Sequence, residues 1–411
     1  MFKQQLINFF NIPFLTQKKF QISLFLYFIL APISYHLMPY IGFYGSDLSM
    51  QYFYTHCPGL ALGSENLYQM TGIMCNNANN THYAYPVLIY RFFSFTTFFN
   101  SFKMFYYFWS ALIILTIMSL PYLWLKKQSH KFNLVYFAIG IITLIQAPSY
   151  FALERGGTDI AFLIPWMFAT YLALKERWIL AGIFMAAAAL LKLYPVMAIM
   201  PIMLRLFIDD KNKIKFLKCC MVITVTVLIN FALDWHLWKT FISEILPIET
   251  KYSIGTNAIG HSLIGPFPKL FVYPLMILFW FLYAQVFALK NNWSKKFTFA
   301  GVLAMSTYFN NHSFDYNLIT AFPFIYLCFE LYFDTESPYF GNQQIMWGIL
   351  LLSFTLLGPA NYLFSHFKFI MRMKLLIELF AFASIPLAIL KKEFPNRKFR
   401  RHFFWGRYEE P

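Results

Sequence analysis

Segments of about 17 to 25 mainly apolar residues recur along the chain, and short polar or basic stretches separate them. An apolar segment of that length is long enough for an α-helix to cross the roughly 30 Å hydrocarbon core of a bilayer. The pattern therefore predicts an all-α polytopic membrane protein in which residues 1–411 form a single integral membrane domain. We expect about twelve transmembrane helices, at 20–39, 104–125, 131–150, 159–174, 178–191, 194–208, 214–233, 263–289, 297–309, 318–333, 345–364 and 374–390.

Two of these spans, 178–191 and 297–309, are short for a helix that crosses a bilayer. Short helices at membrane depth usually line a protected cavity rather than face lipid. No small-x-small cleavage site follows the first span, 20–39. We therefore expect that span to be retained rather than removed as a signal peptide.

The composition supports a membrane protein over a soluble one. Hydrophobic residues make up 59% of the chain and charged residues 12%, whereas soluble domains carry about 25% charged residues. A soluble interpretation would require a core larger than one domain can support. The formal charge is +15, but the basic residues form short clusters between apolar segments, so we expect no nucleic-acid partner.

The charge distribution predicts the orientation in the membrane. With twelve spans, 23 of the 33 Lys and Arg residues fall on the face that carries both termini. The positive-inside rule places that face in the cytoplasm of a cell inner (plasma) membrane. The basic tail, 391–411, is then cytoplasmic, and we expect it to contact anionic membrane lipids.

The opposite, outer face carries the long loops and an excess of carboxylates. The first outer loop spans 40–103, and a second long loop spans 234–262. Because acidic residues contribute little to orientation, their gathering on one face needs another cause, and we expect the working face to be outside. The outer acidic residues are Asp47, Glu65, Glu154, Asp159, Asp234, Glu244, Glu249 and Asp315.

Two cysteines, Cys57 and Cys75, share the first outer loop. In an oxidising compartment they form either a disulfide, which would stabilise the fold by about 3 kcal/mol, or two free thiols. No Cys/His spacing resembles a zinc site, and we expect no metal.

Asp47 follows the first predicted span and lies among aromatic residues in "GSDLSMQYFYTH", 45–56. One interpretation is structural, with Ser46-Asp47 beginning a short outer helix. The other is chemical, because a carboxylate there is placed to accept a proton from a substrate hydroxyl. Further along the loop, Tyr85-Pro86 precedes an apolar aromatic stretch that predicts a second interfacial helix.

Two further motifs place charges at the outer ends of predicted helices. In "ALERGGTD", 152–159, the glycines break the chain and Thr158 or Asp159 caps the next helix. Glu154 and Arg155 are costly at a membrane surface unless they are solvated or paired. Lys192 ends the Ala-rich span, and its spacing leaves two interpretations open: snorkelling to headgroups or pairing with an anionic lipid phosphate.

Two polar clusters precede later spans on the same face. "SIGTNAIGHSLIG", 253–265, contains Asn257 and His261, and "NNHSFDYN", 310–317, contains His312 and Asp315. Each histidine alone is typical of a polar loop. Together with the preceding motifs they make five polar clusters on one face, which indicates a site there.

The stretch "ERGGTDIAFLIPWMFATYLALKERWILAGIFMAAAALLKLYPVMAIMPIMLRL" resembles the central part of glycosyltransferase family 87, in the GT-C superfamily. That pattern is E-R-G-N-x-D, an apolar helix, a basic turn, A-G, an Ala-rich helix and K-x-x-P. The matching residues are Glu154, Arg155, Gly156, Asp159, Ala181-Gly182, Lys192 and Pro195. Gly157 departs from the pattern, since the family often has Asn there. The resemblance covers about 50 residues, and elsewhere it depends on layout.

The resemblance implies a GT-C-like fold and a transfer reaction. Members of the family include polyprenyl-phosphate-mannose-dependent alpha-mannosyltransferases, so we expect a polyprenyl-phosphate sugar as donor and a glycolipid or glycan as acceptor. Asp47 would be the general base of an inverting transfer. Lys192, Arg155 and His312 would bind the donor phosphate. The substrate pocket would include Glu154, Asp159, Tyr85, Asn257, His261 and Asp315. The lipid-linked donor is itself activated, so we expect no cofactor.

Two other functions compete with this hypothesis. A transporter or flippase of a lipid-linked intermediate would also place charges within a membrane protein. Such proteins often show inverted repeats and midplane charges, and neither is evident in the sequence. A non-catalytic subunit that keeps the fold is the third hypothesis.

Overall fold

Every element that the structure describes is helical. The computed structural model describes residues 46–57, 67, 85–125, 132–193, 195–209, 212–245, 269–289, 291–309, 319–334, 336–353, 355 and 368–394. Within these ranges the elements are α3 (Ser46–Thr55), α5 (Val87–Phe93), η2 (Ser94–Phe98), α6 (Phe102–Trp124), α7 (Phe132–Leu144), α8 (Ala147–Arg155), α9 (Ile160–Leu174), α10 (Trp178–Leu191), α11 (Pro195–Ile208), α12 (Lys213–Leu233), α13 (Trp235–Thr240), η4 (Phe241–Ile245), α15 (Lys269–Phe287), α16 (Asn292–Ser306), α17 (Phe322–Phe333), α18 (Gln343–Leu352) and α20 (Lys368–Glu393).

Described helices overlap eleven of the twelve predicted spans. The remaining span, 20–39, lies outside the described residues, as does most of the second half of 345–364. Four described helices are long and apolar enough to cross a membrane by themselves. A bent pair, α7 with α8, raises the number to five. Several other apolar helices, including α9, α10 and α11, have only 10 to 17 residues. The all-helical membrane architecture is therefore confirmed, while the number of twelve crossings and the GT-C-like arrangement stay predictions.

The prediction of one continuous span over 131–150 is wrong. The chain bends by 70° between α7 and α8, and α8 then continues to Arg155. Pro148 lies in the first turn of α8. In a continuous helix Pro148 would have no amide to donate to the Leu144 carbonyl, and its ring would clash with that carbonyl. The break therefore has a local cause, and it brings Glu154 and Arg155 into a helix rather than a loop.

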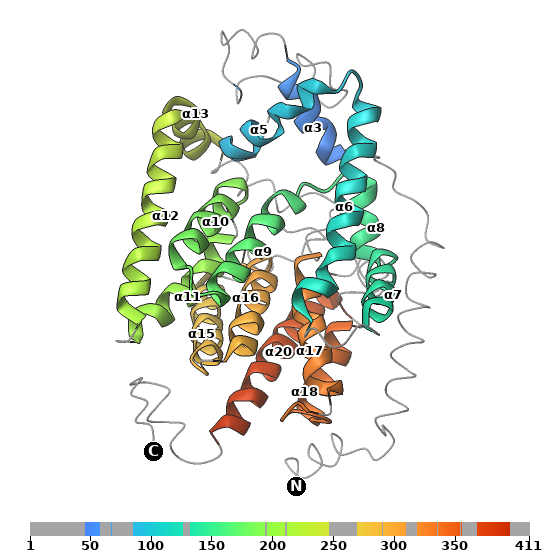
Figure 1. The fold of residues 1–411 in the computed structure, drawn as a ribbon, viewed down its shortest axis with the longest axis vertical. Helices are drawn as coiled ribbons and strands as arrows, with labels where there is room; N and C mark the ends of the chain where they lie inside the picture. The colour runs from blue at the N-terminus through green and yellow to red at the C-terminus, as the bar shows by residue number, and fades with distance from the viewer. Residues whose placement is uncertain are drawn as a thin grey trace.

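The bundle has two distinct ends (Figure 1). At the first, which we call the α3 end, Arg91 of α5 binds Asp234 before α13, and Trp109 of α6 donates to Gly157. At the other, the basic end, Lys296 of α16 donates to the Trp124 carbonyl at 3.2 Å. The first end contains predicted outer loops and the second predicted inner loops. Which end faces the cytoplasm stays a prediction from the charge bias.

Cys57, which follows α3, is disulfide-bonded. Among the described cysteines, Cys219, Cys220 and Cys328 are thiols. For Cys57, therefore, the hypothesis of a free thiol is wrong. Its predicted partner, Cys75, lies outside the described residues.

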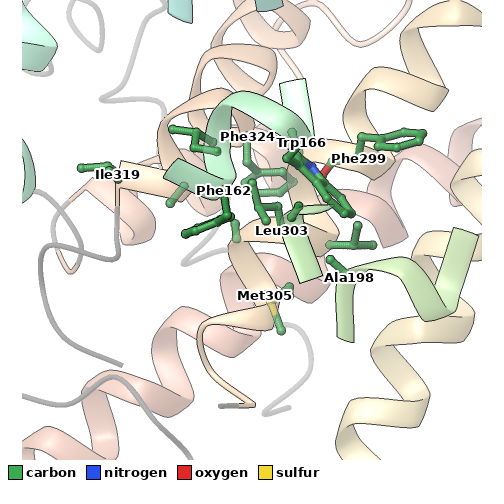
Figure 2. Packing of buried hydrophobic residues seen from close by; sticks show 14 of the residues in the cluster. Phe162, Trp166, Ala198, Phe299, Leu303, Met305, Ile319 and Phe324 are labelled. Carbon is green, nitrogen blue, oxygen red and sulfur yellow. The ribbon is translucent and has the colours of Figure 1, made fainter. Parts of the chain in front are cut away.

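Large aromatic side chains fill the interior between α9 and α16 (Figure 2). Phe162, Trp166 and Leu303 are completely buried. The Trp166 indole donates to the Phe299 carbonyl at 3.2 Å, so its one polar atom is satisfied in the core. Lipid tails are as apolar as these side chains, so their burial stabilises the fold through dispersion contacts rather than through the hydrophobic effect.

Glycines permit the closest helix contacts, as in many membrane bundles. A Cβ added to Gly182 of α10 would lie 3.2 Å from the Cys219 carbonyl of α12. A Cβ added to Gly301 of α16 would lie only 2.1 Å from the ring of Tyr283. That ring is fixed, because its hydroxyl donates to the Phe382 carbonyl at 3.1 Å.

We therefore expect Gly301→Ala to lower the melting temperature of the detergent-purified protein, since overpacking costs about 1–3 kcal/mol. The control is Gly140→Ala, where the nearest atom is the Met118 sulfur at 3.0 Å. That thioether end can move, so the control variant should melt closer to the wild type. Equal melting temperatures for the two variants would contradict a rigid contact at Gly301.

Glu176 joins three elements at the basic end. Its carboxylate pairs with Lys215 of α12 at 2.7 Å and with Lys295 of α16. Trp178 donates to the same carboxylate at 2.9 Å. Burial alone would raise the pKa of Glu176, but these hydrogen bonds prevail and lower it to about 2. The residue has φ 58, an uncommon backbone conformation for a side chain other than Gly, Asn or Asp.

The sign of the pH effect follows from this lowered pKa. The stabilisation by Glu176 is fully present above pH 4.5 and is lost as the pH falls towards about 2. Glu176→Gln should therefore lower the melting temperature at pH 7, and the difference from wild type should shrink below pH 4.5. The effect is modest because the carboxylate is 44% exposed and screened. The control is Glu244→Gln on η4 at the α3 end, an exposed position where the substitution should leave the melting temperature at pH 7 unchanged.

Candidate functional site

The double glycine after α8 ends the helix in a Schellman arrangement. Gly156 has φ 68 and ψ 49, the left-handed conformation that glycine adopts without strain. The Gly157 amide donates to the Ala152 carbonyl at 2.7 Å, and the Gly156 amide donates to Leu153 at 3.2 Å. The turn therefore satisfies the last carbonyls of α8 and directs the chain into α9.

Gly156 has a second role, because α3 comes very close to it. A Cβ added to Gly156 would lie 2.6 Å from the Cβ of Leu48. No other residue type fits this position without displacing α3. The contact fixes the beginning of α3 against the segment 153–159.

Asp47 lies in the first turn of α3, one residue before Leu48. Within the described residues the helix begins at Ser46, which agrees with the structural interpretation of Ser46-Asp47. The Asp47 side chain lies outside what the structure describes. Its backbone is nevertheless adjacent to the residue that contacts Gly156, so the predicted base and the "ERGGTD" motif belong to one region of the molecule.

Polar contacts hold α3 to the next part of the first outer loop. Tyr52 donates to the Phe99 carbonyl at 3.2 Å. The hydroxyls of Thr55 and Thr96 lie 2.5 Å apart, and both residues are buried. Burial raises the pKa of Tyr54 to about 12, so this tyrosine stays protonated at neutral pH.

Two aromatic residues of α6 support the segment 153–159 from the other side. The Trp109 indole donates to the Gly157 carbonyl at 3.1 Å. The Tyr106 hydroxyl donates to the Leu153 carbonyl at 2.8 Å. We did not identify these residues from the sequence, although an i, i+3 aromatic pair at the beginning of a span was visible. Their hydrogen bonds therefore attach the segment 153–159 to α6 through two main-chain carbonyls.

Lys192 forms an ion pair with Asp159, and its ammonium lies 2.7 Å from the carboxylate. The Asp159 side chain is completely buried, and that of Lys192 is 14% exposed. The Lys192 ammonium, at the C-terminal end of α10, therefore binds a buried carboxylate at the beginning of α9 rather than only headgroups. A cation is also favourable at that end of a helix.

The ion pair corrects the predicted cap of α9. Asp159 occupies the N-cap position, but its side chain makes no capping hydrogen bond. The carboxylate binds Lys192 instead. The other predicted cap, Thr158, has no hydrogen-bond partner for its buried hydroxyl among the described residues.

Glu154 lies in the last turn of α8 and is 6% exposed. Its buried Oε1 atom also lacks a hydrogen-bond partner in the part of the chain that the structure describes. A buried polar group left in this state costs about 1–3 kcal/mol, and native proteins retain such groups mainly for a reason. The Glu154 carboxylate and the Thr158 hydroxyl are therefore suited to bind hydroxyl groups of a substrate. Arg155, next to them, is half-buried.

Tyr85 lies beside Pro86, directly before α5, and is half-buried. The predicted helix after Tyr85-Pro86 is present as α5 and η2, and α5 contacts both α3 and α10. Arg91 holds the far end of α5 through a two-point interaction with Asp234. The hydrogen bond to Asp234 raises the pKa of Arg91, although burial alone would lower it.

The structure thus gathers α3, the segment 153–159, α5 and the end of α10 at the α3 end. Four predicted site residues, Asn257, His261, His312 and Asp315, lie outside the described residues. Within the ranges described, no three His, Cys, Asp or Glu side chains come together as a metal site.

The comparisons with known proteins give one match. The model of glycosyltransferase family 87 matches residues 83–307, more than half of the chain. The matched region contains the segment 153–159 and Lys192, and it begins just before Tyr85. No curated protein matches the chain, and no solved structure matches it.

Proposed function

The chain belongs to glycosyltransferase family 87 and is a membrane glycosyltransferase; from this premise we propose its donor, acceptor and mechanism. The enzyme moves a mannose-like hexose from a polyprenyl-phosphate sugar to a glycolipid or glycan acceptor. The transfer occurs at the outer face of the cell inner membrane. The observation that carries the proposal is the contact of α3 with Gly156, beside a buried Asp159–Lys192 pair.

The proposed reaction is a single displacement that inverts the anomeric carbon. The acceptor hydroxyl attacks that carbon, and a new C–O bond forms as the bond to the phosphate oxygen breaks. Asp47 accepts the hydroxyl proton, and the polyprenyl phosphate leaves with the electron pair. A positioned general base of this kind contributes about 10²–10⁴-fold to the rate.

The leaving phosphate gains charge in the transition state and needs fixed cations. We assign this role to Lys192 and Arg155, with His312 as a further member. Asp159 orients the Lys192 ammonium through their 2.7 Å contact, so no reorganisation is required as the charge develops.

The sugar pocket of the proposal combines described and undescribed residues. The Oε1 atom of Glu154 is buried without a partner in the described part of the chain, and it would accept a hydrogen bond from a sugar hydroxyl. Tyr85, Asn257, His261 and Asp315 would line the rest of the pocket. The lipid-linked donor is already activated, so the mechanism uses neither a cofactor nor a metal.

The experiment is turnover by the purified protein in proteoliposomes with a panel of synthetic polyprenyl-phosphate hexoses and alkyl glycoside acceptors. Transfer from the mannosyl donor with inversion supports the proposal. Transfer only from nucleotide sugars would overturn the donor assignment. Movement of the lipid-linked sugar across the bilayer without transfer would favour the transporter hypothesis instead.

A further inference from the structure

A hollow lies on the surface at the N-terminal end of α6. Phe102, Lys103, Tyr106 and Tyr107 line it, and its volume is about 330 Å³. Ligand sites for small molecules generally have volumes of roughly 300–1,000 Å³. The Tyr107 ring is 61% exposed, so its face is accessible to a ligand.

The walls of the hollow contact both halves of the candidate site. The Phe102 ring lies 5.7 Å from Tyr52 and 5.8 Å from Phe53, both on α3. On the other side, the Tyr106 hydroxyl donates to the Leu153 carbonyl of α8. The hollow is therefore continuous with the helix that carries the proposed base and with the "ERGGTD" segment.

The lining combines flat aromatic rings with a cation. The Lys103 ammonium lies 5.9 Å from the centre of the Tyr107 ring. Aromatic faces match the apolar C–H face of a sugar, and an ammonium binds a phosphate as a point charge. Lys192, assigned to the donor phosphate, follows α10 and pairs with Asp159, whereas the hollow adjoins Leu153 through Tyr106. The two positions therefore suit two different substrates.

We propose that this hollow is the acceptor subsite, where a sugar stacks on Tyr107 and an anionic group of the acceptor binds Lys103. This assignment depends on the proposed glycosyl transfer. It identifies the acceptor class as an amphiphile with a sugar and a phosphate in its headgroup. An α6 that begins at the membrane surface presents the hollow at the depth of such headgroups.

The test uses octyl α-mannoside and octyl α-mannoside 6-phosphate, each with a photoreactive diazirine in the alkyl chain. After irradiation with the full-length protein in nanodiscs, mass spectrometry locates the labelled peptides. We expect labelling near residues 102–107, stronger for the phosphate form. Tyr107→Ala should reduce labelling by both probes by about 2- to 10-fold, and Lys103→Ala should remove the preference for phosphate.

The controls are Trp235→Ala and Lys239→Ala, an exposed aromatic residue and an exposed cation on α13 at the same end. These variants should label as the wild type does. In turnover assays, Tyr107→Ala should raise the KM for the octyl mannoside and leave the KM for the donor unchanged. Both substituted side chains are exposed, so the variants should keep their melting temperature.

The subsite is overturned if labelling is unchanged in Tyr107→Ala, or if it falls as much in the Trp235→Ala control as in Tyr107→Ala. Tyr107 would then belong to an ordinary interfacial aromatic belt. Labelling as expected without any transfer by the wild type would keep the subsite and overturn the proposed function. Transfer in which Tyr107→Ala leaves the acceptor KM unchanged would support the proposed function and overturn the subsite.

Discussion

Asp47→Asn is expected to lower kcat for sugar transfer by about 10²–10⁴-fold, because it removes the only proton acceptor that the mechanism assigns. The KM for the donor should change little, since Asp47 acts on the acceptor hydroxyl. Turnover in proteoliposomes with a polyprenyl-phosphate mannose donor measures both quantities.

This substitution separates the two interpretations of Asp47. Asn serves as well as Asp at the beginning of a helix, so a purely structural residue would lose little stability and no activity. The melting temperature should match that of the wild type. Glu244→Gln, an exposed carboxylate on η4 at the same end, is the matched control and should retain full turnover. Near-normal kcat in Asp47→Asn would exclude the proposed base.

Helix positions could be predicted because each apolar run is bounded by charges or helix-breaking residues. The prediction of 178–191 agrees fully with α10, since basic residues lie at both ends of the run. The bend between α7 and α8 was missed because both sides of it are apolar. Hydropathy gives no signal there, and only Pro148 indicated a break.

The residue types of the site could be predicted, but their contacts could not. The left-handed turn at Gly156 could be predicted, because a glycine directly after a helix commonly adopts that conformation. The pairing of Lys192 with Asp159 joins residues 33 positions apart in the chain, and the Trp109–Gly157 bond joins residues 48 apart. Such contacts depend on how the helices pack, which a single sequence does not specify.

The departure from the family pattern at Gly157 has a physical explanation. A Cβ at this position would lie 3.3 Å from the Cβ of Ala152, which is tight. Both main-chain polar groups of Gly157 are hydrogen-bonded, because its amide donates to the Ala152 carbonyl and its carbonyl accepts from the Trp109 indole. In this chain the position contributes through its main chain, so the absence of an Asn side chain leaves the turn intact.

Substitutions in the Asp159–Lys192 pair are expected to have large effects on both stability and sugar transfer. Lys192→Met leaves the buried Asp159 carboxylate without this cation, and breaking a buried pair costs about 3–5 kcal/mol. We expect a marked fall in melting temperature together with loss of transfer. Asp159→Asn should destabilise less, because Lys192 is 14% exposed and can reach water.

The double variant Lys192→Met/Asp159→Asn distinguishes a structural pair from a functional one. Removing both charges should restore most of the stability, but transfer should stay lost if Lys192 binds the leaving phosphate. The matched control is the buried Lys374–Glu378 pair of α20, 3.1 Å apart. There, Lys374→Met/Glu378→Gln should recover stability and transfer together. Recovery of transfer in the Lys192→Met/Asp159→Asn variant would show that the pair only holds α9 and α10 together, because a neutral side chain cannot stabilise a developing phosphate charge.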